Sequence, residues 1–175
     1  MDVFQAIQER REITKYLNKP IPNEVLRKIE DAGLYAPSGN NLPSKRLIVV
    51  ENRDSLDQLA ETTPYMKWLT EAQAAIAIIG IPAESKYWLQ DASIASAFIW
   101  LQAVEEGLGA AFGAVYHAEN EQESIQRESH VREILHLPKE DRVIAVLGLG
   151  YPAEIPEAKK HIPKEDIVYY EKYHK

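Results

Sequence analysis

Apolar and polar positions alternate along the chain with two different periods. Helical spacing of apolar residues, together with caps and breaks, predicts helices over residues 3–11, 23–36, 54–61, 87–107 and 119–135. Short apolar runs bounded by turn residues predict strands over residues 46–51, 73–80, 109–115 and 142–150. This mixture is typical of a sheet covered by helices, and the pattern alone leaves an α/β and an α+β fold open.

Two segments lack this periodicity. Pro37 ends the second helix, because a proline disfavours helical geometry in the residue before it. A loop rich in small polar side chains follows over residues 38–44. The segment 151–175 holds prolines and several aromatic residues without a regular spacing. Neither segment is predicted to form a long helix or strand.

The central helix, residues 87–107, is apolar around much of its circumference. Its apolar positions include Ile94, Ala95, Ala97, Phe98, Trp100, Leu101 and Val104. A single domain has few elements with which to cover all these sides, so a partner helix is a reasonable cover. The apolar positions of the tail are Ile162, Ile167, Val168, Tyr169, Tyr170 and Tyr173. Their irregular spacing favours a tail that wraps over a second subunit, and we expect a homodimer.

Composition limits the kinds of protein that this chain can be. Its 175 residues suffice for one domain, and 45% hydrophobic with 27% charged residues is an ordinary globular balance. The absence of cysteine excludes disulfides and thiolate metal sites, and it fits a reducing compartment. Residues 1–16 lack the apolar core of a signal peptide, and the apolar stretch 94–104 is too short to span a membrane. We expect a cytoplasmic protein without a membrane partner.

Charge is distributed unevenly along the chain. The net charge is −7, yet residues 1–50 hold eight basic and six acidic side chains. Residues 51–150 hold seven basic and sixteen acidic side chains. The acidic body argues against nucleic-acid binding, whereas the basic excess near the N-terminus suits a small anion such as a phosphate.

Several familiar motifs are absent or incomplete. The segment Gly107-Leu108-Gly109 follows a helix and lacks the third glycine of a dinucleotide fingerprint. His117-Ala118-Glu119 lacks the cysteine pair of the zinc deaminases, and the five histidines have no metal-binding spacing, so we expect no metal. No Gly-x-Ser-x-Gly nucleophile motif occurs. The residues therefore indicate no protein nucleophile, acid or base.

Two candidate binding features remain. Arg10 and Arg11 end the first helix, where they could bind an anion or simply complement the helix dipole, which is the more ordinary role. Lys15 and the tail segment Lys159-Lys160-His161 allow the same two interpretations, binding or solvated surface charge. The loop over residues 37–41 could be only a connector, yet its small side chains and free backbone N–H groups equally suit a planar polar ligand.

Six short motifs then follow one another in a specific order. They are Arg10-Arg11-Glu12-Ile13-Thr14-Lys15-Tyr16, Asn18-Lys19-Pro20-Ile21-Pro22, Ala36-Pro37-Ser38, Gly39-Asn40-Asn41-Leu42, a central helix from Asp91 to Gly107-Leu108-Gly109, and Gly150-Tyr151-Pro152-Ala153-Glu154. Along nearly its whole length the chain resembles the nitroreductase family of FMN enzymes. Each motif alone is weak, whereas the set in register is specific for the family but not for one member.

The resemblance implies an α+β fold in which helices flank a mostly antiparallel central sheet, and a two-fold dimer. It implies one FMN-binding domain over residues 1–154, with a C-terminal extension over residues 155–175 that wraps the partner subunit. The implied activity passes hydride from NADH or NADPH through flavin N5 to nitroaromatic, quinone or similar electron-poor acceptors, in ping-pong order. The flavin carries the chemistry, so no catalytic side chain is assigned.

The resemblance also implies where the phosphate of FMN would bind. Arg10 would bind the phosphate, and Arg11 would lie against the phosphate or the ribityl chain. Lys159 and His161 would complete the phosphate site from the tail. Lys15 would stand in for a basic residue that usually reaches the flavin pyrimidine.

A second group of residues would line the isoalloxazine ring. The other subunit would contribute Pro37, Ser38, Gly39 and Asn41. The backbone of Ala111, Phe112 and Gly113 would lie by the reactive edge of the ring.

The chain departs from the family pattern at four places. Pro43-Ser44-Lys45 replaces a more usual Gln-Pro-Trp. Glu12 replaces a serine that usually hydrogen-bonds the phosphate, Thr14 replaces a basic residue, and His161 stands where an arginine is common. A carboxylate beside a phosphate is repulsive, unless Glu12 points away or pairs with Arg11. The weakened basic set motivates an alternative function, a non-catalytic FMN carrier or sensor.

Overall fold

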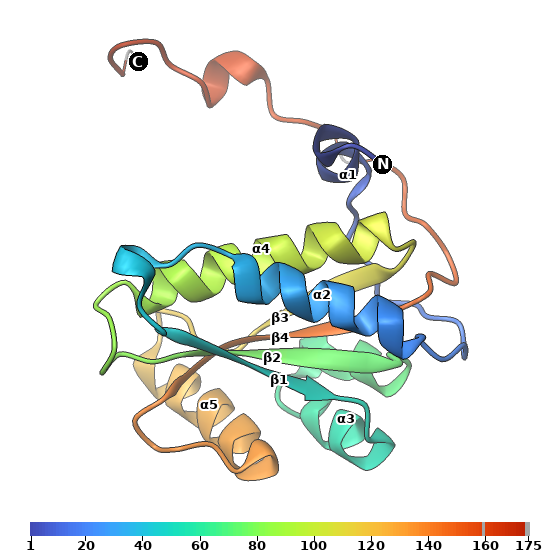
Figure 1. The fold of residues 1–175 in the computed structure, drawn as a ribbon, viewed down its shortest axis with the longest axis vertical. Helices are drawn as coiled ribbons and strands as arrows, with labels where there is room; N and C mark the ends of the chain where they lie inside the picture. Colours follow the sequence, from blue (N-terminus) through green and yellow to red (C-terminus); the bar gives the residue numbers. More distant parts are fainter. Residues whose placement is uncertain (159, 174–175) are drawn as a thin grey trace.

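The computed structural model describes residues 1–158 and 160–173 and contains a four-stranded sheet with helices on both faces (Figure 1). The strands are β1 (Lys45–Val50), β2 (Ala74–Gly80), β3 (Gly109–Ala114) and β4 (Arg142–Gly150). The α-helices are α1 (Val3–Glu9), α2 (Asn23–Tyr35), α3 (Arg53–Leu59), α4 (Trp88–Glu105) and α5 (Glu121–Leu135). Three short 3-10 helices complete the described elements, namely η1 (Gly39–Asn41), η2 (Pro64–Thr70) and η3 (Lys164–Asp166).

The sheet has the strand order β1-β2-β4-β3, and every neighbouring pair is antiparallel. This arrangement confirms the α+β expectation and settles the choice that the sequence pattern left open. The strand β2 is buried along its whole length because it has a strand on each side and helices on both faces. That position explains why it reads as a continuous apolar run rather than as an alternating one.

Two apolar cores lie on the two faces of the sheet, and β2 contributes alternate residues to each. Ile76 and Ile78 point into the core beneath α2 and α4, where Ile99 is fully buried. Ala77 and Ile79 point into the core beneath α3 and α5. This period of two is the ordinary geometry of a strand, and the two cores fix which helices cover which face.

The structure moves several predicted boundaries by one or two residues. The first helix ends at Glu9, so Arg10 is its C-cap rather than part of the helix. The helix α2 begins at Asn23 as predicted and ends at Tyr35, one residue earlier than predicted. The helix α3 begins at Arg53, and its N-cap Asn52 accepts the backbone N–H of Ser55. The 3-10 helix η2 occupies residues for which the pattern predicted no element.

The N-terminal helix and the C-terminal tail lie outside these layers. The helix α1 packs on α4, with only Ala6 buried, while Val3 and Phe4 are exposed. The tail runs past α1 and away from the sheet (Figure 1). Its described apolar side chains, from Ile155 to Tyr173, are all exposed. Both segments therefore present apolar surface without cover from the described chain.

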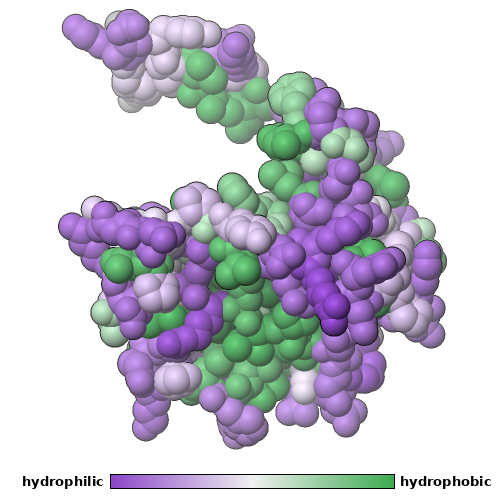
Figure 2. Space-filling view, viewed as in Figure 1, coloured by the Kyte–Doolittle hydropathy of each residue, from purple (hydrophilic) through white to green (hydrophobic). Residues whose placement is uncertain are grey.

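Apolar surface is also visible on the face shown in Figure 2, beneath the edge of the sheet and between α3 and α5. Five partly buried apolar residues pack against the core of that layer, namely Ile48, Trp68, Ile134, Leu135 and Leu137. Among the described helices, none is long and apolar enough to cross a membrane.

Candidate functional site

The segment after α1 places Arg10 and Arg11 at a fixed position beside β3. Ile13 donates its backbone N–H to the carbonyl of Ala110 over 3.0 Å, and Glu12 forms a parallel bridge with Ala110. The side chain of Ile13 packs where a Cβ on Gly109 would lie, so glycine is required there for this close approach. Arg10 and Arg11 lie three and two residues before Ile13, so the bond of Ile13 to β3 also fixes the position of the arginine pair.

The side chain of Arg11 is partly committed to the backbone. Its Nη1 donates to the carbonyl oxygens of Gln8 and Arg10 over 2.8 and 2.9 Å. Its Nε is buried and has no hydrogen-bond partner among the described residues. Since a buried donor without a partner is costly, this atom is a candidate for contact with a bound acceptor.

A cavity of about 300 Å3 collects basic residues that are distant in sequence. It is lined by Ile7, Gln8, Arg10, Arg11, Lys160, His161, Ile162 and Ile167. The structure thus brings three predicted residues, Arg10, Arg11 and His161, to one hollow and adds Lys160. Among the described residues, no carboxylate lies within ion-pair distance of Arg10 or Arg11. Lys159, the remaining residue predicted for this group, lies outside the described residues.

Lys15 does not line this cavity. Its Nζ forms an ion pair of 3.3 Å with Oε1 of Glu71, and both side chains are about half exposed. The other oxygen of Glu71 accepts the backbone N–H of Tyr16 over 3.5 Å. Lys15 is therefore held by a carboxylate, unlike the two arginines. Glu12 forms no ion pair with Arg11 among the described contacts, so it does not neutralise the arginine pair.

Tyr16 fixes the other end of this segment. Its hydroxyl donates to the carbonyl of Gly148 over 3.2 Å, and its ring occupies the space beside Gly150. Burial raises the pKa of Tyr16, and the carboxylates of Glu12 and Glu71 raise it further. Tyr16 therefore remains a neutral hydrogen-bond donor, and its bond to Gly148 joins the end of segment 10–16 to β4.

The predicted residues of β3 lie next to the arginine segment. Ala111 and Gly113 are buried in the strand, and Phe112 is partly buried. A Cβ at Gly113 would lie 2.6 Å from Cε of Met66, so the backbone there approaches η2 closely. The structure places this part of the predicted set beside Arg10 and Arg11.

The loop containing Pro37, Ser38, Gly39 and Asn41 lies elsewhere, at the start of α4. Ser38 bonds the carbonyl of Leu42 over 2.8 Å, and Asn40 and Asn41 have positive φ. Pro37, Ser38 and Asn41 border a hollow of about 770 Å3 between α2 and β1. This hollow contains neither of the two arginines.

Asp91 holds this loop in place, and the sequence analysis assigned it no role in the site. It is 3% exposed and accepts the backbone N–H of Gly39 over 2.9 Å and the hydroxyl of Ser44 over 2.5 Å. A Cβ at Gly39 would lie 2.7 Å from the ring of Tyr87, so this position requires glycine. The available signal was a carboxylate inside an otherwise apolar stretch.

The predicted residues therefore form two groups at different positions along α4. The loop group is bonded to Asp91 in the first turn, whereas Arg10 and Arg11 contact Trp100 in the second half of the helix. Asp91 and Trp100 are nine residues apart, which is about 14 Å along the helix axis. The hollow beside the loop group and the cavity beside the arginines have no lining residue in common.

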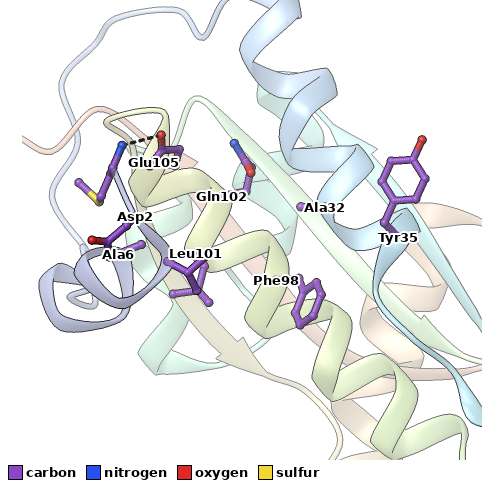
Figure 3. A pocket seen from close by; sticks show the side chains of 10 residues that line it. Asp2, Ala6, Ala32, Tyr35, Phe98, Leu101, Gln102 and Glu105 are labelled. Atoms are coloured by element: carbon purple, nitrogen blue, oxygen red, sulfur yellow. Dashed lines mark hydrogen bonds and ion pairs between the residues drawn. The ribbon is translucent and has the colours of Figure 1, made fainter.

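Between these groups, α1, α2 and α4 enclose an apolar hollow of about 520 Å3 (Figure 3). Tyr35, Phe98 and Leu101 line it, and the ion pair of Met1 with Glu105 closes one side. None of the residues predicted to contact FMN borders this hollow. Its lining is suited to apolar packing.

Within the part of the chain that the structure describes, no cluster of three histidine, aspartate or glutamate residues could hold a metal ion.

Comparison with known proteins gives consistent matches. A model described as the nitroreductase family matches residues 7–63 and 57–151. A relative from Methanothermobacter thermautotrophicus, provisionally named an NADH dehydrogenase/NAD(P)H nitroreductase, is 38% identical over 159 residues, 89% of this chain and 80% of its own.

Solved structures agree with these sequence matches. A provisionally named NADH dehydrogenase/NAD(P)H nitroreductase from Bacteroides thetaiotaomicron superposes with a TM-score of 0.89 at 35% identity, covering 98% of both chains. An FMN-dependent nitroreductase from Clostridium difficile superposes with a TM-score of 0.87 at 30% identity, covering 97% of this chain and 99% of its own.

Proposed function

The chain belongs to the nitroreductase family, and from this membership we propose that it is an FMN-dependent oxidoreductase. It takes electrons from NADH or NADPH and passes them to an electron-poor small molecule such as a nitroaromatic or a quinone. Similar proteins with activities of this kind in their names include the FMN-dependent nitroreductase of Clostridium difficile and an NAD(P)H FMN reductase of Bacillus subtilis.

The observation that carries the proposal is the cavity shared by the N-terminal arginines and the tail. It offers two guanidinium groups, an ammonium group and an imidazole, together with one buried Nε of Arg11 that has no partner among the described residues. This donor set fits a phosphate monoester, because guanidinium groups match phosphate oxygens in both charge and geometry. The residues present thus fit the phosphate end of FMN.

The protein's part in the chemistry is to bind and orient. Arg10, Arg11 and His161 hold the phosphate, and Lys159 is proposed to join them. Lys15 is proposed to reach the flavin once it leaves Glu71. FMN, when bound, supplies a two-electron carrier, so donor and acceptor use one slot in turn and no side-chain nucleophile is needed.

We further propose that the working unit is a homodimer whose sites are built from both chains. The loop of Pro37, Ser38, Gly39 and Asn41 is bonded to Asp91, whereas Arg10 lies over Trp100, nine residues further along α4, so the other subunit supplies this loop. The segment 1–154 forms the domain, and the tail 155–175 packs on the partner. The exposed apolar residues of α1, α4 and the tail support this arrangement, since such patches mark interfaces.

The cofactor assignment is tested by purifying the chain and identifying the flavin that denaturation releases. FMN is expected, because the cavity has basic groups for one phosphate. Recovery of FAD, or failure to bind added FMN, would contradict the proposal.

Anaerobic mixing with NADH and then NADPH is expected to bleach the flavin band. No bleaching with either donor would favour the alternative, a non-catalytic FMN carrier or sensor. This alternative is motivated by the pairing of Lys15 with Glu71 and by the departures at Glu12, Thr14 and His161.

The dimer is tested by sedimentation of the full chain and of a variant that lacks residues 155–175. We expect the full chain to sediment as a dimer and the truncated variant to lose both dimer stability and flavin content. An active, flavin-loaded monomer of 19.9 kDa would show that the shared site is wrong. A full-length variant with Lys164→Ala, an exposed polar position of the tail, serves as the control and should remain dimeric.

A further inference from the structure

Trp100, in the second half of α4, contacts both residues of the arginine pair. The guanidinium carbon of Arg10 lies 4.6 Å from the centroid of the Trp100 ring. The indole N–H of Trp100 donates a hydrogen bond of 3.3 Å to the backbone carbonyl of Arg11. One side chain thus fixes the position of Arg10 through its ring and of Arg11 through its nitrogen.

From these contacts we propose that Trp100 is a positioning residue that orients Arg10 and Arg11 toward a phosphate monoester. The inference rests on the proposed function and deepens it, because it names the residue that prepares the phosphate site. It concerns the protein's own side chains, since the two contacts are present before any phosphate binds.

The mode of contact suits a binding arginine. A guanidinium that lies on an aromatic face is held by its flat side, whereas its N–H donors point outward along its edges. The ring attracts the cation without neutralising it, as a carboxylate would. Arg10 is therefore held in place with its charge and its fork of donors still available.

Trp100 is itself held by β3. Its ring lies nearly parallel to that of Phe112, with an interplanar angle of 6° and centroids 6.3 Å apart. Two residues before Phe112 in the same strand, the carbonyl of Ala110 accepts the backbone N–H of Ile13, which lies two residues after Arg11. Two connections therefore join the arginine segment to the same strand, one through side chains and one through backbone. Such double support restricts the guanidinium of Arg10 to a narrow range of positions.

An ordinary core role predicts a different result. Trp100 is partly buried and packs against the core beneath α2 and α4. If packing were its whole contribution, its replacement would lower the free energy of unfolding and weaken every flavin alike. A positioning role instead affects ligands that carry a phosphate more than ligands that lack one.

The test compares FMN with riboflavin, which has the same ring and ribityl chain but no phosphate. Dissociation constants of both are measured by fluorescence titration on the full-length, flavin-free protein. The variants are Trp100→Leu, which removes the ring and the N–H, and Trp100→Phe, which keeps a ring. The control is Trp88→Phe, on the same helix, where the Trp88 ring also lies near an arginine, Arg142, at 5.5 Å.

We expect the wild type and Trp88→Phe to share one preference for FMN over riboflavin. Trp100→Leu should lower that preference about tenfold, a size usual for loss of a cation–π contact and a hydrogen bond. Trp100→Phe should lie between them, since it restores part of the stacking. If Trp100→Leu does not fold, a reduced preference in Trp100→Phe alone supports the inference.

An unchanged preference in folded Trp100 variants, with both flavins weakened equally, would overturn the positioning role and leave the proposed function intact. Failure of the wild type to bind FMN would overturn the proposed function, and this inference with it. The two failures are therefore distinguishable in one set of titrations.

Discussion

Two arginine sites in this molecule share one kind of aromatic support but differ in their acidic partners. Arg142, on β4, lies over the rings of Tyr116 and Trp88, and it donates to both carboxylate oxygens of Glu128 over 2.8 and 2.9 Å. Arg10 lies over Trp100, and no carboxylate is within ion-pair distance of it among the described residues. The aromatic ring places the guanidinium in each case, and the acidic partner decides whether its donors are free.

The electrostatic environment reflects this difference. Hydrogen bonding by Glu128 raises the pKa of Arg142, although burial acts in the opposite direction. Glu128 is 2% exposed and also accepts the backbone N–H of Val143 and the hydroxyl of Ser124. Two donors of Arg142 are thus already bonded to Glu128 within the fold, whereas Arg10 keeps its donors available. The comparison suggests that a binding arginine is recognised by what it does not contact.

The largest expected effect comes from breaking the satisfied site. Arg142→Ala removes the two-pronged partner of the buried Glu128 and leaves it only the ion pair with Arg132 at 4.0 Å. Breaking a buried pair in this way typically costs about 3–5 kcal/mol of folding free energy. Urea unfolding followed by circular dichroism measures the loss. The phosphate preference of the protein that remains folded should not change. A loss below about 1 kcal/mol would show that the buried pair contributes no more than a surface pair.

A smaller effect is expected at the site with free donors. Arg10→Ala should weaken FMN binding by about 1.5–3 kcal/mol, the usual scale for a hydrogen bond to a charged group. Circular dichroism should hardly change, because Arg10 lies beyond the end of α1. Fluorescence titration measures the affinity, and Arg27→Ala, an exposed arginine on α2, is the control. Unchanged FMN affinity would return Arg10 to the role of an ordinary surface charge.

The smallest effect is expected at Lys15, which is intermediate between the two arginines. It has an acidic partner, Glu71, yet the pair is exposed and contributes at most about 1 kcal/mol to stability. Glu71→Gln should release Lys15 and strengthen flavin binding slightly, with unfolding nearly unchanged. Lys15→Ala should weaken binding by less than Arg10→Ala does. Fluorescence titration with FMN measures the affinity of both variants. A loss of affinity in Lys15→Ala larger than in Arg10→Ala would contradict the expected ranking of the two residues.

The periodic pattern predicted the elements whose environment is uniform along their length. The strand β4 and the helix α4 are close to their expected ranges, because burial of β4 on both faces and the long apolar run of α4 leave a clear signal. The 3-10 helix η2 was missed, since seven residues in that geometry do not establish a recognisable period. The ends of helices and strands shifted by one or two residues, because terminal turns fray and their boundaries carry a weak signal.

Long-range contacts explain what the sequence could not predict. Glu128 belongs to the acidic helix α5, yet it is buried because Arg142 approaches it from β4. Trp100 was expected only as one side of an apolar helix, because its partners Arg10 and Arg11 lie 89 or more residues away. Lys15 was predicted to bind the flavin, but its ion pair with Glu71, a residue distant in sequence, could not be predicted. Residue type and motif order identified candidates, but only the fold shows which charges are already paired.

The position of the two groups along α4 has a consequence for mixed subunits. If each site takes its arginines from one chain and its loop from the other, defects in the two groups complement each other. A subunit with Arg10→Ala and a subunit with Gly39→Val would each form homodimers in which both sites bind FMN weakly. Their heterodimer would contain one doubly altered site and one site with both groups intact. Mixing the two variants at limiting FMN would then restore tight flavin binding to half of the sites of each heterodimer.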